Sequence, residues 1–187
     1  MKLYDNPHAP NPRRVRMVLA EKGITCDVET LDLAAGDNLK EEFCAKNPFA
    51  KVPVLELDDG LCLSESLYGT SPKERAIIDM WNERMESMLL NPAMFAFQHI
   101  TGFFKDRMTP VEAFGQESAK NFLKALPVLE TQLANNEWIA GGQFSIADIT
   151  ALVAIDFARI VKVRVGDDMP NIQRWYGAMR ERASYKA

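Results

Sequence analysis

The first third of the chain alternates short branched runs with a stretch of helical periodicity. Residues 2–5 and 25–31 are short and rich in strand-forming side chains, so both predict strands. Between them, apolar residues recur three and four positions apart until Gly23, where a helix is expected to end. Asn11 and Pro12 suit the start of that helix, as its side-chain cap and its first residue. A strand, a helix and a strand in this order predict a parallel pair.

Two further features complete the predicted first domain. Residues 38–46 form an amphipathic stretch that predicts a short helix, which Asn47 and Pro48 would end. Residues 54–57 and 61–63 flank an Asp-Asp-Gly sequence, which is a common turn, and so predict a β-hairpin. The expected order of elements is therefore β-α-β-α-β-β.

The remainder of the chain has a helical pattern throughout. Three predicted helix starts pair a Ser or Thr with an acidic residue three positions later, so that side chains satisfy the free amides; they are Ser71–Glu74, Thr109–Glu112 and Ser145–Asp148. We interpret Ser145 and Asp148 as structural capping residues and not as a catalytic pair. Residues 146–163 are apolar on nearly every side, which predicts a buried central helix. We expect a first domain over residues 1–67 and an all-helical second domain over 68–187.

The composition of the chain limits the classes of partner. Its 187 residues are 47% hydrophobic and 26% charged, which is typical of a globular protein that can bury a core. A formal net charge of -4 argues against nucleic acid or an anionic membrane surface as the main partner, because both attract a basic face. No run reaches the roughly 18 to 20 apolar residues of a membrane span. We therefore expect a cytoplasmic protein with neither nucleic acid nor a membrane as its partner.

The cysteines and histidines do not predict a metal centre. Cys26, Cys44 and Cys62 are widely spaced, without a CxxC motif, and only His8 and His99 could join them as ligands. Such a pattern fits reduced thiols in a cytosolic protein. We therefore expect no bound metal.

Four segments of the chain resemble the glutathione transferase superfamily in their order and spacing. They are KLYDNPHAPNPRRVRMVLAEKGI, NPFAKVPVLELDDGLCLSES, GGQFSIADITA and PNIQRWYGAMRERAS. The first is most similar to a fungal and bacterial class that lacks the usual Tyr, Ser or Cys at the thiol-activating position. The resemblance implies an α/β thioredoxin-like N-terminal domain that binds glutathione and an all-α C-terminal helical bundle that shapes the substrate pocket. It also implies a homodimeric detoxification enzyme, which conjugates glutathione to small hydrophobic electrophiles.

The resemblance implies four glutathione-binding residues before the hairpin. Val52 and Pro53 match the family's cis-proline turn, whose free backbone groups pair with an extended peptide ligand. An ordinary trans proline at a strand start is the alternative. Lys51 and Asn38 match positions that contact the glycyl end of the ligand, although Asn38 could instead cap the short helix.

The sequence after the hairpin both matches the family and departs from it. Glu65 and Ser66 match an acidic-Ser pair at a helix start, where Ser66 would bind the γ-glutamyl carboxylate and Glu65 the ligand amine; a plain helix cap is the alternative. The helix and linker that should follow, about 15 residues in four helical turns, are absent between Leu67 and Tyr68. Because their loss would uncover one face of the sheet, we hypothesise that the complete protein contains a segment here that the sequence leaves out.

Two residues are candidates for activating the thiol, which ionises near pH 8.5 when free and so needs help at pH 7. Asn11 could donate a hydrogen bond to the thiolate but could not act as a base; a plain helix cap is its alternative role. His99 lies among phenylalanines and could position a water near the thiol, or could simply belong to a core or pocket wall. Glutathione-dependent disulfide reductase or peroxidase activity and a non-catalytic binding or regulatory role remain alternatives to conjugation.

Overall fold

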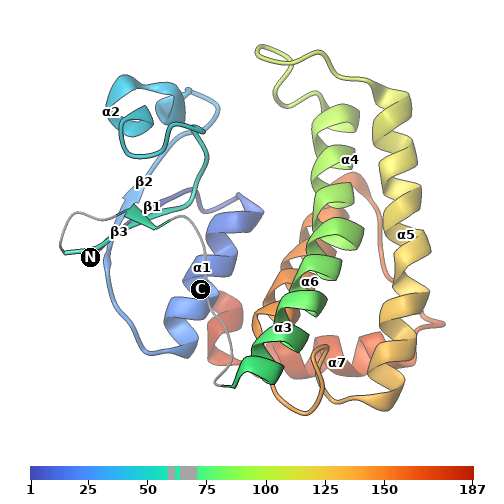
Figure 1. Ribbon diagram of the computed structural model, residues 1–187. Helices are drawn as coiled ribbons and strands as arrows, with labels where there is room; N and C mark the ends of the chain where they lie inside the picture. The colour runs from blue at the N-terminus through green and yellow to red at the C-terminus, as the bar shows by residue number, and fades with distance from the viewer. Residues whose placement is uncertain (59–61, 64–70) are drawn as a thin grey trace. The chain divides into compact units, whose positions relative to one another are not determined.

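The computed structural model describes residues 1–58, 62–63 and 71–187, which divide into two units (Figure 1). The first unit contains residues 1–67 together with the last two residues of the chain, and the second contains residues 68–185. The Leu67–Tyr68 junction lies outside the described residues, so the hypothesis of a segment missing there stays a prediction.

The first unit is built on a mixed sheet with the strand order β2-β1-β3-β4. The strands are β1 Lys2–Asp5, β2 Asp27–Thr30, β3 Val54–Glu56 and β4 Cys62–Leu63. β1 pairs with β2 in parallel, whereas β3 is antiparallel to both β1 and β4. The predicted parallel pair is therefore confirmed, and so is the antiparallel pairing of the predicted hairpin strands.

The two helices of this unit differ in their bounds from the sequence-based prediction. α1 spans Pro10–Glu21 and begins after Ala9, so the prediction that Asn11 caps it was wrong. Proline at the first helical position has a suitable fixed φ and lacks only an amide that would be unpaired there, which explains the earlier start. The predicted helix over 38–46 is divided into a 3₁₀ turn, Asp37–Leu39, and the short α2, Glu41–Cys44, because Lys40 has an extended backbone.

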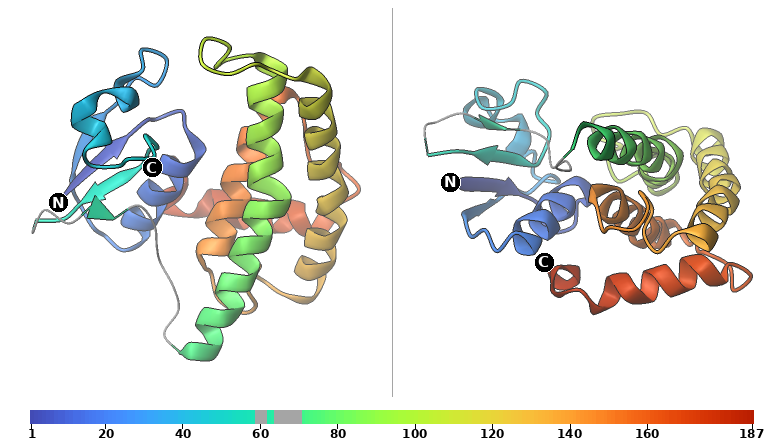
Figure 2. Two further views of the ribbon diagram at one scale, coloured as in Figure 1. Left: turned by 45° about the horizontal axis from the view of Figure 1, so that its top comes forward. Right: turned by 60° about the horizontal axis from the view of Figure 1, so that its bottom comes forward.

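α1 and α2 lie on opposite faces of the sheet (Figure 2). Successive strand residues point to opposite faces, so Leu3 and Asp5 share one face while Tyr4 belongs to the other. Arg16 of α1 pairs with Asp5 at 2.6 Å, which places α1 on the first face. On the second face, the ring of Phe43 from α2 packs edge-on against Tyr4 at a centroid distance of 5.9 Å.

The second unit is helical, as predicted. Its α-helices are α3 Pro72–Met85, α4 Asn91–Thr101, α5 Glu112–Asn135, α6 Ile146–Ala158 and α7 Pro170–Glu181, with 3₁₀ turns at Arg159–Val161 and Ala183–Lys186. A π-helical turn, Glu86–Leu90, joins α3 to α4, and the three form one unbroken helix in Figure 2. Pro92 lies two residues after the end of this turn, as the second residue of α4. Proline inside an α-helix clashes with the carbonyl four residues earlier, and the wider turn before Pro92 accommodates it.

α6 is the buried helix of this unit, as its apolar sequence predicts. Ten of its 13 residues are buried, and they include Asp148 and Thr150. The Thr150 hydroxyl donates to the Asn82 side chain of α3 at 2.6 Å, so the buried hydroxyl has a partner. No helix in the described part of the chain is long and apolar enough to cross a membrane.

Two of the predicted helix starts have different outcomes. The Ser71 hydroxyl accepts from the Glu74 amide at 3.2 Å and the Glu74 carboxylate accepts from the Ser71 amide at 3.1 Å, which confirms this capping box. The prediction for Thr109 was wrong, because α5 begins at Glu112 after Val111. The Val111 amide donates to Nδ1 of His99 at 2.9 Å, so a side chain of α4 satisfies it in place of Thr109.

Candidate functional site

One edge of the sheet gathers the predicted glutathione-binding residues that the structure describes. Tyr4 of β1 lies opposite Val54 of β3, and Asp5 lies beside Thr30 of β2. The loops that follow β1 and β2 and the loop that precedes β3 must therefore all lie at this edge. Asn11 follows the first of these loops in the first turn of α1, the second leads to Asn38, and the third carries residues 51–53. The fold alone thus brings these separate segments of the first unit together.

Val52 and Pro53 present an unused backbone at this edge. The peptide bond between them is cis. Val52 packs its side chain against the buried cluster of Tyr4, Leu31, Phe43 and Val54. Neither its amide nor its carbonyl has a hydrogen-bond partner among the described residues. An extended peptide ligand can therefore pair with this residue as a neighbouring strand would.

The loop between α2 and β3 is closed by two asparagine side chains. Nδ2 of Asn47 donates to the Lys51 carbonyl at 2.8 Å, and Nδ2 of Asn38 donates to the Ala50 carbonyl at 2.6 Å. Ala50 has a φ of 53°, in the left-handed region, and so gives the loop a sharp turn. The amide nitrogen of Asn38 is thus used within the protein.

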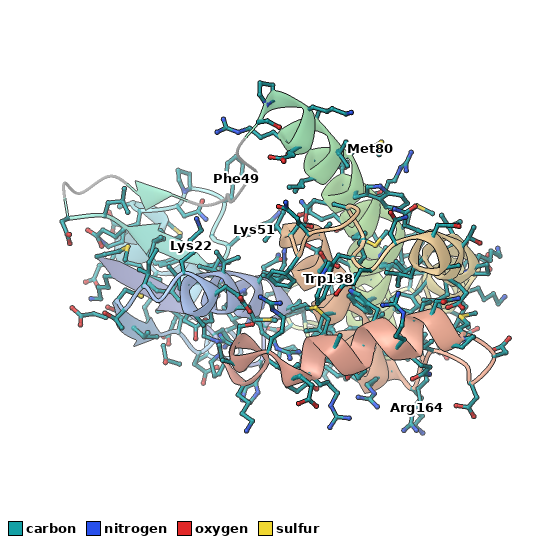
Figure 3. The ribbon with its side chains drawn as sticks, turned by 90° about the horizontal axis from the view of Figure 1, so that it is seen from below. Lys22, Phe49, Lys51, Met80, Trp138 and Arg164 are labelled. Atoms are coloured by element: carbon teal, nitrogen blue, oxygen red, sulfur yellow. The ribbon has the colours of Figure 1, made fainter. Side chains whose placement is uncertain are left out.

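The loop also carries two exposed side chains, Phe49 and Lys51, which are labelled in Figure 3. Phe49 is 81% exposed, which is unusual for a phenylalanine. Lys51 is exposed and its ammonium has no partner among the described residues, so a carboxylate of a ligand can reach it.

The start of α1 has few groups that can bind an anion. A helix start normally offers four free amides, but Pro10 and Pro12 have none. The Asn11 amide has no partner within the described residues. Nη1 of Arg14 donates to Oδ1 of Asn11 at 3.4 Å, which leaves the Asn11 side-chain NH₂ group to donate elsewhere. The donors of Asn11 are therefore the ones to consider for a thiolate.

Arg16 fixes the loop between β1 and α1, a role that the sequence analysis missed. Its guanidinium donates to the carboxylate of Asp5 at 2.6 Å and to the Pro7 carbonyl at 3.3 Å. Asp5 is only 4% exposed, and a buried carboxylate needs such a partner. On the other side of the loop, the Asn6 side chain donates to the Leu31 carbonyl at 2.9 Å. Only the fold reveals this function, because an Arg eleven residues after an Asp is no motif.

A second polar group fastens the segment after α2 to the sheet. Nζ of Lys46 lies 3.0 Å from the Glu56 carboxylate, which also accepts from the Tyr4 hydroxyl at 2.8 Å. The hydrogen bonds with Tyr4 and Glu56 raise the pKa of Lys46, and those from Tyr4 and Lys46 lower the pKa of Glu56. Lys46 therefore stays charged at neutral pH, and it holds the start of the loop between α2 and β3 against Glu56 of the sheet.

Glu65 and Ser66, the remaining predicted glutathione ligands, lie outside the described residues. Among the residues that the structure does describe, no three His, Cys, Asp or Glu side chains form a group that could hold a metal ion.

His99, the second predicted catalytic residue, belongs to the helical unit. Its Nδ1 accepts the Val111 amide, and its ring packs edge-on against Phe114 at a centroid distance of 5.0 Å. With Nδ1 occupied as an acceptor, the neutral ring carries its proton on Nε2. His99 therefore links α4 to Val111 and to Phe114 at the start of α5.

Ser145 and Asp148 form a buried capping arrangement at the start of α6. One carboxylate oxygen of Asp148 accepts the Ser145 amide at 2.9 Å and the Ser145 hydroxyl at 3.0 Å. The other accepts the Ile139 amide and Nε1 of Trp175, both at 2.9 Å. Burial raises the pKa of Asp148, while these four donors act in the opposite direction. All four contacts lie within the protein, which fits a structural role.

Comparison with known proteins identifies the family. Residues 1–70 match the glutathione S-transferase N-terminal domain, and residues 89–183 match the glutathione S-transferase C-terminal domain. The chain is 35% identical to Glutathione S-transferase 2 of Saccharomyces cerevisiae, over all of this chain and 88% of that protein. The chain belongs to the glutathione S-transferase family.

Solved structures of glutathione S-transferases confirm the predicted fold. A glutathione S-transferase domain-containing protein of Marinobacter aquaeolei aligns with a TM-score of 0.93 and 38% identity, over 98% of this chain and 99% of the other. Gtt2 of Saccharomyces cerevisiae aligns with a TM-score of 0.93 and 34% identity, over 100% and 99% of the two chains. The protein therefore has a thioredoxin-like domain followed by an all-helical domain, and its classification as a glutathione transferase is confirmed.

The alignment with the yeast glutathione S-transferase is longer than this chain. It extends over 205 positions although this chain has 187 residues, a difference of 18 positions.

Proposed function

We propose that the protein binds glutathione at the sheet edge described above and conjugates it to small hydrophobic electrophiles. The observation that carries this proposal is the unused backbone of Val52, beside the cis bond to Pro53. A tripeptide such as glutathione has its own unpaired amides and carbonyls, and pairing them with Val52 satisfies both partners. The family uses glutathione as its co-substrate, which makes this tripeptide the natural ligand of the edge.

Charged groups would fix the two ends of the ligand. Lys51 is exposed and suits the glycyl carboxylate. Asn38 acts through the loop in this proposal, because its amide is occupied by Ala50. Glu65 and Ser66 are proposed to hold the γ-glutamyl end, as in the resemblance noted from the sequence.

Asn11 is proposed to stabilise the thiolate, in place of the Tyr, Ser or Cys of other classes. Its side-chain NH₂ group and its backbone amide can both donate to sulfur, whereas neither can remove a proton. Catalysis would therefore rest on thiolate stabilisation and on the proximity of the two substrates. His99 is proposed to position a water through Nε2, because its Nδ1 already accepts the Val111 amide.

The remaining proposals follow from the family. We propose a cytoplasmic homodimer that acts in detoxification, with apolar electrophiles as its second substrates. Phe49, which is 81% exposed, is proposed as a contact for the partner subunit because burial of its ring there would remove apolar surface from water.

Thermal unfolding with and without glutathione tests binding. A ligand that binds only the native state raises apparent stability by about 2.7 kcal/mol at a hundredfold excess over its Kd. Conjugation to a small aromatic halide then tests catalysis in the native protein, in Asn11→Ala and in His99→Ala. We expect Asn11→Ala to bind glutathione but to lose about tenfold or more in kcat, the effect of one lost charge-assisted hydrogen bond.

The possible results separate the alternatives. Binding without turnover in the native protein would show a non-catalytic module. No stabilisation by glutathione would remove the proposed site altogether.

A further inference from the structure

Asn47 organises the loop that leads to the ligand-binding edge. It is 9% exposed, and its side chain and its main chain both form hydrogen bonds within the first unit. Its side chain donates to the Lys51 carbonyl at 2.8 Å and accepts the Phe49 amide at 3.1 Å. Its main chain accepts from Ala50 and donates to Phe43, both at 2.9 Å. Asn47 therefore connects the segment after α2 to both Phe49 and Lys51.

The hydrogen bond to Lys51 determines the direction of the next amide. In a planar trans peptide, the carbonyl and the amide hydrogen point to opposite sides. Asn47 draws the Lys51 carbonyl toward itself, so the Val52 amide of the same peptide unit points away from Asn47. That amide has no partner among the described residues.

Asn38 acts in the same way one peptide earlier. Its side chain donates to the Ala50 carbonyl at 2.6 Å, which turns the Lys51 amide to the opposite side. Its Oδ1 is buried and has no partner among the described residues, so Asn38 holds this position at the expense of an unsatisfied acceptor. Two successive peptide units are thus oriented by side-chain amides that donate to their carbonyls.

We propose that Asn47, assisted by Asn38, is a positioning residue for glutathione, which keeps the Val52 amide directed toward the bound peptide. The proposal rests on the proposed function, since it assumes that glutathione binds at Val52. Orienting this amide in advance avoids the cost of ordering the loop when the ligand binds. The consequence is a specific effect on glutathione affinity from a residue that makes no contact with glutathione.

Asn47→Asp provides the test. The substituted carboxylate still accepts the Phe49 amide, but it repels the Lys51 carbonyl instead of donating to it. The Kd for glutathione, measured by titration calorimetry, should rise about three- to tenfold, the equivalent of one hydrogen bond. The KM for glutathione should rise equally, while the KM for the electrophile stays unchanged.

Asn135→Asp is the matched control. Asn135 also donates its side-chain amide to a backbone carbonyl, that of Thr131 at 3.1 Å, but on the exposed surface of α5. It should leave both KM values as they are. Asn38→Ala is the second variant of the loop, and it should weaken glutathione binding in the same direction.

An NMR titration of the unaltered protein tests the proposal even if the variants do not fold. The Val52 amide signal should shift on addition of glutathione, while the Asn47 side-chain NH₂ signals stay in place. Larger shifts at the Asn47 NH₂ group would overturn the proposal by making Asn47 a direct ligand. Unchanged glutathione affinity in Asn47→Asp would also overturn it, with the proposed function intact. Failure of the native protein to bind glutathione would instead refute both.

Discussion

Replacement of Asp148 by asparagine is expected to destabilise the helical unit by about 3 kcal/mol. Asp148 is completely buried and accepts four hydrogen bonds, two from Ser145 and one each from Ile139 and Trp175. Asparagine has one acceptor oxygen in place of two. Its NH₂ group would face two of the four donors and could not accept from them. The Ser145 hydroxyl can rotate and accept, but a backbone or indole N–H cannot.

The magnitude follows from the groups that lose their partner. At least one buried N–H is left unpaired, at about 1 to 3 kcal/mol, and the remaining bonds lose the assistance of a charge. For a chain of this length, about 3 kcal/mol corresponds to a decrease of about 6 to 12 °C in Tm. Asp148→Ala, which removes all four bonds, should cost more, about 4 to 5 kcal/mol.

Urea unfolding followed by far-UV circular dichroism, with thermal scans in parallel, measures this effect. Asp167→Asn is the control, because Asp167 is an exposed aspartate of the same unit and should change stability by less than about 0.5 kcal/mol. Ser145→Ala should give an intermediate loss of about 1 kcal/mol. A loss below about 1 kcal/mol for Asp148→Asn would refute the argument that this carboxylate holds the start of α6.

Two other substitutions test separate contacts of the helical unit. The Glu130 carboxylate caps α7 by accepting from the backbone of Asn171 and Ile172, at 2.9 Å each. Burial alone would raise the pKa of Glu130, but the hydrogen bonds outweigh it and the pKa is lowered. The stabilisation that the Glu130 carboxylate provides is therefore complete above its ordinary pKa of about 4.3, and it is lost as the pH falls through the lowered pKa. The deficit of Glu130→Gln in urea melts should therefore shrink from pH 7 to below pH 4, and a constant deficit would contradict this. Gly115→Ala should cost about 1 to 3 kcal/mol, because its Cβ would lie 2.9 Å from side-chain atoms of α4. Gly177→Ala on α7, where a Cβ meets nothing within 4 Å, should instead stabilise by up to about 1 kcal/mol, and equal effects would disprove the close packing of α4 and α5.

Hydrophobic periodicity correctly predicted whether most segments are helices or strands. Capping residues predicted the starts of α1 and α5 at the wrong positions. The buried α6 was predictable because apolar side chains on every side of a helix leave no solvent-exposed face. The start of α5 was not, since a capping box at Thr109 satisfies every sequence rule. His99, ten residues earlier, takes the amide of Val111 instead. A competing partner from another helix leaves no trace in the local sequence.

The candidate site shows the same division between motif and context. Val52 and Pro53 could be singled out from their sequence, because the flanking residues match a known turn. For Asn47 the sequence predicts only the end of a helix, although an asparagine side chain often bonds to the backbone two residues later, as it does here with Phe49. The hydrogen bond from Asn47 to the Lys51 carbonyl depends on the left-handed backbone of Ala50. The sequence does not predict this conformation, because residues other than glycine seldom adopt it.

The start of α1 sets a limit on how strongly this protein can activate a thiol. Pro10 and Pro12 remove two of the free amides that make a helix start attractive to anions, and Arg16 is committed to Asp5. If Asn11 supplies the main donors, the bound thiol should ionise only somewhat below its ordinary pKa of about 8.5. The rate of conjugation, as kcat/KM for glutathione, should then rise steadily between about pH 6 and 8. A rate that is already constant at pH 6 would require a stronger activating group than Asn11, and the proposed mechanism would have to be abandoned.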